Sequence, residues 1–177
     1  MNNPKYYAIR TGDSSEGCNF DNSFKTPLKN KDYKKMAWGV NKTTISDTRI
    51  IKMNAYQGDT YIVLFQNEPN NYPYALCKLK NKNVIRERNL GPLINIDSTN
   101  TEIGWTSSTQ YGNDDFKHIF YFDTIYPLKR DSFDGYKVKG QKTFFEIRRG
   151  IKNETLLDKL DEEFKYIIRY VEPIHFT

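Results

Sequence analysis

The chain has 177 residues, of which 37% are hydrophobic and 15% aromatic, and its formal net charge is +5. This length suits one domain, so we treat residues 1–177 as a single unit. No apolar run approaches the roughly 20 residues of a spanning helix, which excludes a helical membrane protein. Clustered Lys and Arg attract phosphates, so the charge favours a polyanionic partner.

The first predicted elements surround a long polar loop. Residues 5–10 read as a strand, and the Asn, Asp, Ser, Lys and Gly content of 12–31 predicts a loop of a length that is often functional. A short helical turn over 31–36 would lead to Ala-Trp-Gly-Val at 37–40. Residues 47–53 fit either a short helix or a strand.

The middle of the chain predicts a meander of strands. The β-branched and aromatic run 60–65 is a buried strand, and the turn cluster 67–73 joins it to a second strand over 74–79 as a hairpin. A polar stretch over 81–109 contains the second tryptophan. The alternating, aromatic run 117–126 then predicts another core strand.

The end of the chain predicts a short strand and one amphipathic helix. Residues 144–147 are the strand, and about 153–170 is the helix, with Asp and Glu opposite its apolar face. The predicted apolar face consists of Leu156, Leu157, Leu160, Phe164, Ile167 and Ile168. The whole pattern is α+β: a strand-rich barrel flanked by helices.

The cysteines and the N-terminal residues indicate the cellular compartment. Cys18 and Cys77 form no CxxC pair and lie beside no histidine at metal spacing, so we expect free thiols, no metal site and no cofactor. Residues 1–5 lack the apolar stretch and cleavage site of a secretory signal. We therefore expect an intracellular protein, cytoplasmic or, in a eukaryote, nuclear.

The order of elements around the two tryptophans resembles the YTH domain family of the PUA-like superfold. The aromatic strand 6–11 leads through a loop to Trp38, and the hairpin leads through a second loop to Trp105. The aromatic strand 119–122 follows, and Lys-Gly-Gln-Lys at 139–142 is similar to the family's Asp-Gly-Gln turn. The resemblance implies a PUA-like open β-barrel of YTH or EVE-like type.

The resemblance also implies a binding site for a methylated base. In that family a methylated adenine is flipped into an aromatic cage, for which Trp38, Trp105 and Tyr111 are the candidate walls. The backbone of Gly39 would accept a hydrogen bond from the exocyclic amine. Thr11 and Asp13 are further candidates for contact with the base, Asp13 in place of a side chain that Gly12 lacks.

Phosphate contacts follow from the same resemblance. Arg10 matches a basic position that meets backbone phosphate, and Lys137 and Lys139 lie near a second one, where the family's arginine is replaced. The implied partner is methylated DNA or RNA, with no membrane and no catalysis. Two settings stay open: an N6-methyladenine reader of RNA, and the DNA-specificity domain of an McrB-type modification-dependent restriction subunit, fused to or associated with a motor or nuclease.

Two rival interpretations belong to other classes. Asp114, Asp115 and His118 lie close together in the sequence and would suit a metal-dependent nuclease, although an Asp-Asp pair in a Gly/Asn-rich loop is typical of a solvated turn. Alternatively, the barrel is a protein-interaction module and both tryptophans belong to its core. No GxSxG motif or Gly-rich phosphate loop supports a triad or a nucleotide site.

Overall fold

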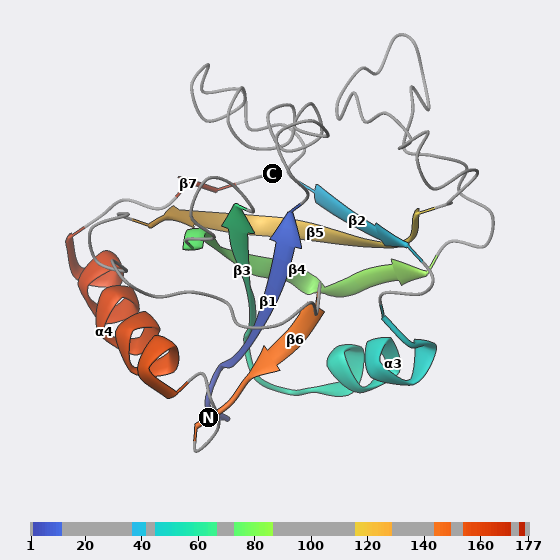
Figure 1. Ribbon diagram of the computed structural model, residues 1–177, viewed down its shortest axis with the longest axis horizontal. Coiled ribbons are helices and arrows are strands. Elements are labelled where there is room, and N and C mark those ends of the chain that lie inside the picture. The colour runs from blue at the N-terminus through green and yellow to red at the C-terminus, as the bar shows by residue number, and fades with distance from the viewer. Residues whose placement is uncertain are drawn as a thin grey trace, which may run out of the picture.

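The structure is a computed structural model that describes residues 2–11, 37–41, 45–66, 73–86, 116–128, 144–149, 154–170 and 174–175 (Figure 1). These residues form an α+β fold, as the sequence predicts. The strands are β1 (Lys5–Thr11), β2 (Ala37–Asn41), β3 (Thr60–Gln66), β4 (Pro73–Arg86), β5 (Phe116–Pro127), β6 (Phe144–Ile147) and β7 (Ile174–His175). The helices are α3 (Asp47–Ala55) and α4 (Glu154–Tyr170).

The strands form one mixed sheet in the order β2-β5-β4-β3-β1-β6, with β7 paired to β5. β1 and β3 are parallel, and the other pairs are antiparallel. Within the described residues the end strands β2 and β6 do not pair with each other. The prediction of an open barrel is therefore confirmed only in its coarser form, an open α+β sheet, and closure into a barrel is not seen among the described strands.

Strand bounds depart from the predicted ones at the second strand of the hairpin. β4 continues to Arg86, beyond the predicted end at residue 79, into a stretch expected to be polar loop. The extension pairs with β5, where Val84 is opposite Phe120 and Arg86 is opposite His118. Strand pairing thus overrides weak local propensity. The two-residue strand β7 is not predicted by the sequence either.

The centre of the sheet is buried on both faces. Ile62, Val63 and Leu64 of β3 are each 0% exposed, although successive side chains of a strand point to opposite faces. The run of apolar residues in β3 is explained by this double burial, since a strand that is covered on both sides has no polar face. Helix α4 covers one face of the sheet. Helix α3 lies on the opposite side of the molecule from α4, in contact with β4 (Figure 1).

Helix α4 packs on the face that Tyr6, Ala8 and Val63 share. Its contact residues recur at helical spacing, as the amphipathic pattern predicts. The prediction is wrong for Ile168, which is 62% exposed, because it lies about 120° around the helix from Leu156, at the edge of the apolar stripe. The buried helix residues are Leu156, Leu157, Leu160 and Ile167, with Phe164 partly buried.

Residues 47–55 are helical, which decides between the two predicted states. Ser46 is the N-cap, and its hydroxyl oxygen accepts a hydrogen bond from the Arg49 N–H at 3.3 Å. Asp47 in the first turn and Lys52 in the last complement the helix dipole. Ile50 and Met53 are buried, so α3 is anchored by one narrow face. Neither described helix is long and apolar enough to cross a membrane.

The sheet curls strongly, and the bend lies where β4 pairs with β5. Leu79 is opposite Phe122 and Val84 is opposite Phe120, so residues 80–83 form a bulge in the ladder. Bulges bend a strand and increase its twist. In a flat sheet β5 and β6 would lie four strand spacings, about 19 Å, apart. Instead the rings of Phe120 and Phe144 are 5.9 Å apart, so the two halves of the sheet face each other.

Candidate nucleic-acid interface

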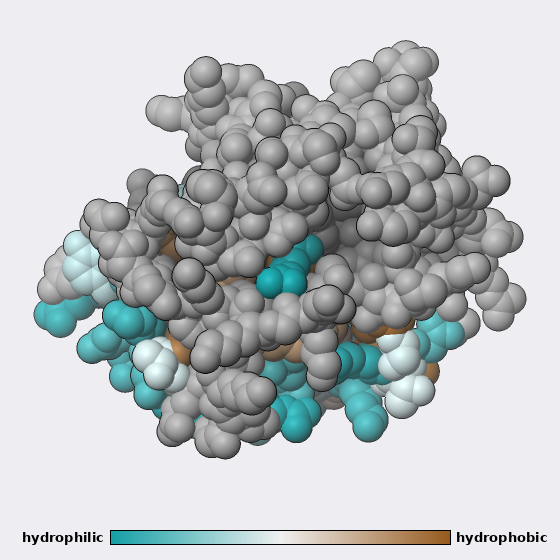
Figure 2. Space-filling view, in the orientation of Figure 1, coloured by the Kyte–Doolittle hydropathy of each residue, from teal (hydrophilic) through white to brown (hydrophobic). Residues whose placement is uncertain are grey.

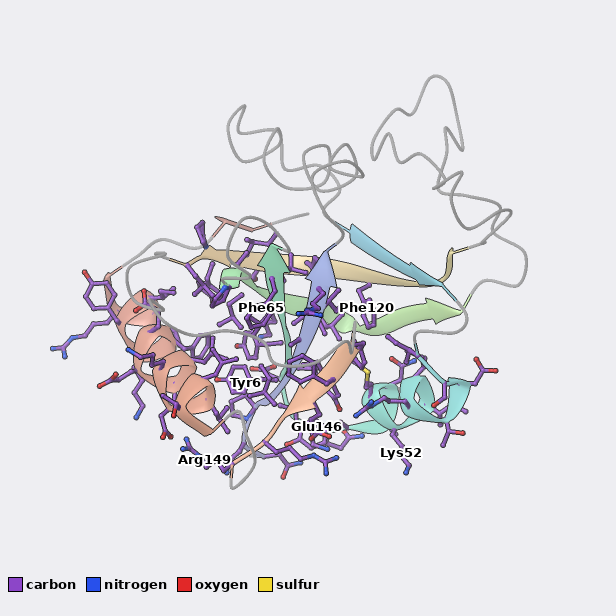
Figure 3. The ribbon with its side chains drawn as sticks, in the orientation of Figure 1. Tyr6, Lys52, Phe65, Phe120, Glu146 and Arg149 are labelled. Atoms are coloured by element: carbon purple, nitrogen blue, oxygen red, sulfur yellow. The ribbon has the colours of Figure 1, made fainter. Side chains whose placement is uncertain are left out.

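Three aromatic rings stack in the interior of the curled sheet. The ring of Phe144 lies 5.3 Å from that of Tyr7 and 5.9 Å from that of Phe120, with interplanar angles of 12° and 14°. All three side chains are buried. Offset stacking at these separations is favourable beyond the area that it buries. The stack therefore joins β1 and β6 to β5, which is a neighbour of neither in the sheet, and Figure 3 labels Phe120 of β5.

Strand β2, which carries two predicted cage residues, lies beside this stack. Trp38 is the register partner of Phe120, and Gly39 is the partner of Ile119. The backbone of β2 is described, and the Trp38 side chain lies outside the description. The register shifts between Val40 and Asn41, at the end of the strand. The structure thus places position 38 one strand away from the buried aromatic contact.

The end of β1 lies on the other side of the same stack. Phe144 pairs with Ile9, and Thr11 lies two residues further along β1. Because β1 and β3 are parallel, Thr11 and its partner Gln66 end at one edge of the sheet. Arg10 is partly buried and is the register partner of Phe65. By alternation it shares the face of Tyr6 and Ala8, toward α4, and not the face of the stack.

The other predicted site residues lie outside the described residues. The convergence of two indoles on one pocket therefore stays a prediction. His118 of the rival metal site pairs in β5 with Val40 and Arg86, and its side chain is outside the description. Within the described ranges no three His, Cys, Asp or Glu residues group at metal-binding distance. The predicted residues outside the description are Asp13, Trp105, Tyr111, Lys137 and Lys139, and Asp114 and Asp115 of the rival.

Charged groups lie close to Tyr7 and Phe144 of the aromatic stack. Burial raises the pKa of Tyr7, and the carboxylate of Glu146 raises it further, while Arg49 and Arg148 lower it. Two guanidinium groups from different elements thus act on one phenol. Arg148 donates to Glu146 at 2.5 Å, and this hydrogen bond raises the pKa of Arg148. The Arg49 guanidinium lies over the ring of Phe144, 5.4 Å from its centroid.

The opposite face of β1 carries a different polar group. The Tyr6 hydroxyl donates to a carboxylate oxygen of Asp161 at 3.1 Å. Burial and the nearby Asp161 carboxylate both raise the pKa of Tyr6. Arg149, just after β6, pairs with both Asp158 and Asp161 of α4. These contacts connect helix α4 to the sheet, and Arg149 has two carboxylate partners in them.

The described cysteine is structural. Cys77 is a free thiol that is 0% exposed in β4, as expected for a chain with unpaired cysteines. Burial raises its pKa well above the ordinary value. Only the thiolate is a strong nucleophile, so a thiol kept neutral and inaccessible is not a catalytic candidate. Cys18 lies outside the description.

The sequence patterns do not reveal the residues around the stack. They predict Phe120 and Phe144 only as strand residues, since nothing local shows that strands 24 positions apart along the chain face each other. The sequence patterns do not predict Arg49 or Lys5 as candidate site residues either. The spacing of two cations in α3 could have indicated a basic surface. Arg49 and Lys52 are three residues apart and so lie on one side of the helix, whereas Asp47 lies on another side.

Comparison with known proteins adds little to this geometry. No family model matches the chain, and no curated protein matches it. Among solved structures, the chain is similar to the YTH domain of the Zygosaccharomyces rouxii MRB1 protein, in complex with N6-methyladenosine RNA. The identity is 10%, the TM-score is 0.44, and 97% of this chain and 90% of that chain are covered. A likeness of this degree assigns neither a fold family nor a ligand to this chain.

Proposed function

We propose that this chain is a non-catalytic nucleic-acid-binding domain that recognises a modified base, N6-methyladenine first. The base would be flipped out of its strand into a cage of Trp38, Trp105 and Tyr111, with the Gly39 backbone, Thr11 and Asp13 as polar contacts. Arg10, Lys137 and Lys139 would hold flanking phosphates. The fold would be an open PUA-like barrel of YTH or EVE-like type.

The contact between Phe120 and Phe144 is the observation that supports this proposal most directly. It joins the half of the sheet that contains β2 to the half that contains β1. Trp38 is the register partner of Phe120, and Phe144 is the register partner of Ile9, next to Arg10. Four strand spacings in a flat sheet would keep these positions too far apart for one nucleotide. This contact supports the proposal because it brings the half of the sheet that contains position 38 against the half that contains the end of β1.

The chemistry of the proposed cage matches its ligand. A base that stacks on an aromatic side chain gains about 1–3 kcal/mol, and every base offers a π face. Selectivity for the methylated form would come from the methyl group, which loses little by exchanging water for ring faces. A backbone acceptor at Gly39 would bind the remaining N–H of the methylated amine, a contact that needs no side chain.

Two biological settings suit this site, and the same modified base is the first ligand to test in both. One is a reader of RNA, and the other is the DNA-specificity domain of a modification-dependent restriction system, fused to or associated with a motor or nuclease subunit. Single-stranded RNA with one N6-methyladenosine probes the first setting. Matched single-stranded DNA with one N6-methyladenine probes the second.

A binding titration with matched oligonucleotides tests the proposal. Each pair, one of RNA and one of DNA, differs by one methyl group on one adenine. We expect tighter binding of the methylated member, and loss of that preference in Trp38→Ala and in Trp105→Ala, with about 1–3 kcal/mol of binding free energy lost for a lost stack. Equal affinity for both members of both pairs would refute modified-base recognition.

The control variant is Tyr166→Ala, which removes an aromatic ring that is 45% exposed on α4. It should leave the methyl preference unchanged. Arg10→Gln should weaken binding of methylated and unmodified strands by the same factor, since phosphate contacts do not distinguish bases. Cleavage of the oligonucleotide in Mg²⁺ or Mn²⁺ that disappears in Asp115→Ala would instead support the metal-dependent nuclease.

A further inference from the structure

A row of cations follows one side of α3 and continues onto the start of β1. Arg49 and Lys52 are three residues apart in the helix and so lie on adjacent positions of one side. Tyr56, the C-cap residue, continues the row, and Lys5 lies over its ring with Nζ 4.2 Å from the centroid. We name Lys5, Arg49 and Lys52 the cationic stripe.

The cationic stripe is not neutralised by neighbouring acids. Within the described part of the chain, the ion pairs involve other cations, namely Lys78, Arg148 and Arg149, and none joins a stripe residue to a carboxylate. Asp47, the acid of the same helix, lies about 160° around the helix from Arg49. Among the described residues, the stripe therefore has no carboxylate counter-ion, and its Lys52 is exposed to solvent.

Aromatic rings hold two of the stripe cations in place. Arg49 lies over Phe144 and Lys5 lies over Tyr56, each within the range of a cation–π contact. Such contacts orient a cation and leave its outward N–H groups free to bind an anion, unlike a carboxylate, which occupies them. Lys52 is exposed on α3, where Figure 3 labels it, and the surface near α3 in Figure 2 mixes hydrophilic with hydrophobic residues, Ile51 being 63% exposed.

We propose that the cationic stripe of Lys5, Arg49 and Lys52 is a second, sequence-independent contact surface for the phosphodiester backbone of a single-stranded nucleic acid. The proposal rests on the proposed function in one respect, that the partner is a nucleic acid. From Arg49 to Tyr56 the helix rises about 10 Å, which is enough for two consecutive phosphates of an extended strand. Lys5 lies about 16 Å along β1 from Arg10 and, by alternation, on the opposite face of the sheet, so the stripe is a surface separate from the proposed Arg10 contact.

The salt dependence of binding tests this surface separately from base recognition. The probe is an unmodified single-stranded RNA, titrated by fluorescence anisotropy between about 50 and 200 mM KCl. Each lost phosphate contact lowers the slope of log affinity against log salt by about 0.7 for a single strand. We expect Arg49→Gln/Lys52→Gln to lower the magnitude of the slope by about 1.4.

The matched control is Lys159→Gln/Lys165→Gln, which removes the same net charge from exposed positions of α4. Its slope should equal that of the unmodified protein. Equal losses in both double variants would show that net charge alone matters and would overturn the proposal, as would an unchanged slope in the stripe variant. If the stripe variant does not fold, Lys52→Gln alone, at an exposed position, should lower the slope by about 0.7.

The outcomes separate this inference from the proposed function. A slope that depends on the stripe, together with equal affinity for methylated and unmodified strands, would keep the stripe and remove the modified-base reader. Stripe-dependent binding to phosphatidylserine vesicles, with an RNA slope that does not change, would overturn the proposal in favour of a lipid surface. Absence of binding to both the RNA and the DNA strands, methylated or not, would overturn both.

Discussion

The two faces of β1 use charge in opposite ways. On the α4 face, Tyr6 donates to Asp161, and Arg149 pairs with both Asp158 and Asp161. On the other face, Arg148 pairs with Glu146 beside Tyr7, whereas Arg49 lies over the ring of Phe144 and joins none of the ion pairs of the described residues.

This difference distinguishes paired from unpaired cations among the described residues. A net charge of +5 says nothing about where the cations lie. In the described residues, Asp158 and Asp161 of α4 form ion pairs with Arg149, whereas none of the ion pairs involves Lys5, Arg49 or Lys52. The first arrangement fastens a helix to a sheet, and the second leaves a surface that attracts polyanions.

The largest effect is expected from Phe120→Ala. Phe120 is 0% exposed and stacks on Phe144, so the truncation should lower the free energy of unfolding by about 3–5 kcal/mol, measured by urea denaturation. The variant should also bind methylated oligonucleotide more weakly at temperatures where it is folded, since position 38 keeps its backbone partner but loses the aromatic ring opposite it. The matched variant Leu160→Ala on the α4 face should lose about 2–5 kcal/mol of stability and keep its binding. Equal losses of binding in both variants would contradict our inference that the face with the aromatic stack, and not the α4 face, supports binding.

A smaller effect is expected from Tyr6→Phe. The lost hydrogen bond to Asp161 should lower the free energy of unfolding by about 1 kcal/mol at neutral pH. Because burial raises the pKa of Tyr6 above its ordinary 10.0, the folded state holds the phenolic proton that the unfolded state releases. The contribution of Tyr6 to the free energy of unfolding is therefore constant below about pH 10. Above that pH the contribution falls, by up to about 1.4 kcal/mol per pH unit.

The measurement is urea unfolding as a function of pH on the alkaline side. Tyr6→Phe should lose part of the alkaline decline, and the decline that remains should reflect Tyr7 and Cys77, whose pKa values are also raised by burial. An identical alkaline decline in the variant and the unmodified protein would show that Tyr6 ionises as readily in the folded state as in the unfolded one.

The smallest stability effect is expected from Arg149→Gln. Its pairs with Asp158 and Asp161 are solvent-exposed, and exposed ion pairs contribute little to stability. Thermal melting should show no measurable change. The salt dependence of RNA binding should also be unchanged, because this cation already has carboxylate partners, whereas Arg49→Gln should lower the slope. A larger slope change in Arg149→Gln than in Arg49→Gln would contradict our assignment of the two faces.

Local patterns predict most of the described elements. The run of β-branched and aromatic residues at Thr60–Gln66 and the helical spacing of Leu156, Leu160 and Ile167 each specify their own conformation. Burial of Cys77 follows from its place in a hairpin strand. The prediction fails where pairing decides, as in β4 beyond residue 79, since a polar stretch becomes a strand only when a neighbour supplies its hydrogen bonds.

The sequence by itself determined the type of the main elements, the amphipathic face of α4 and the basic character of the chain. Only the tertiary structure decided that the described sheet curls, that Phe120 meets Phe144, and that Arg49 lies over Phe144 while Lys5 lies over Tyr56. The physical reason is range. Propensity and periodicity act within a few residues, whereas a curl depends on a bulge between distant strands and on side chains that meet across the space between them.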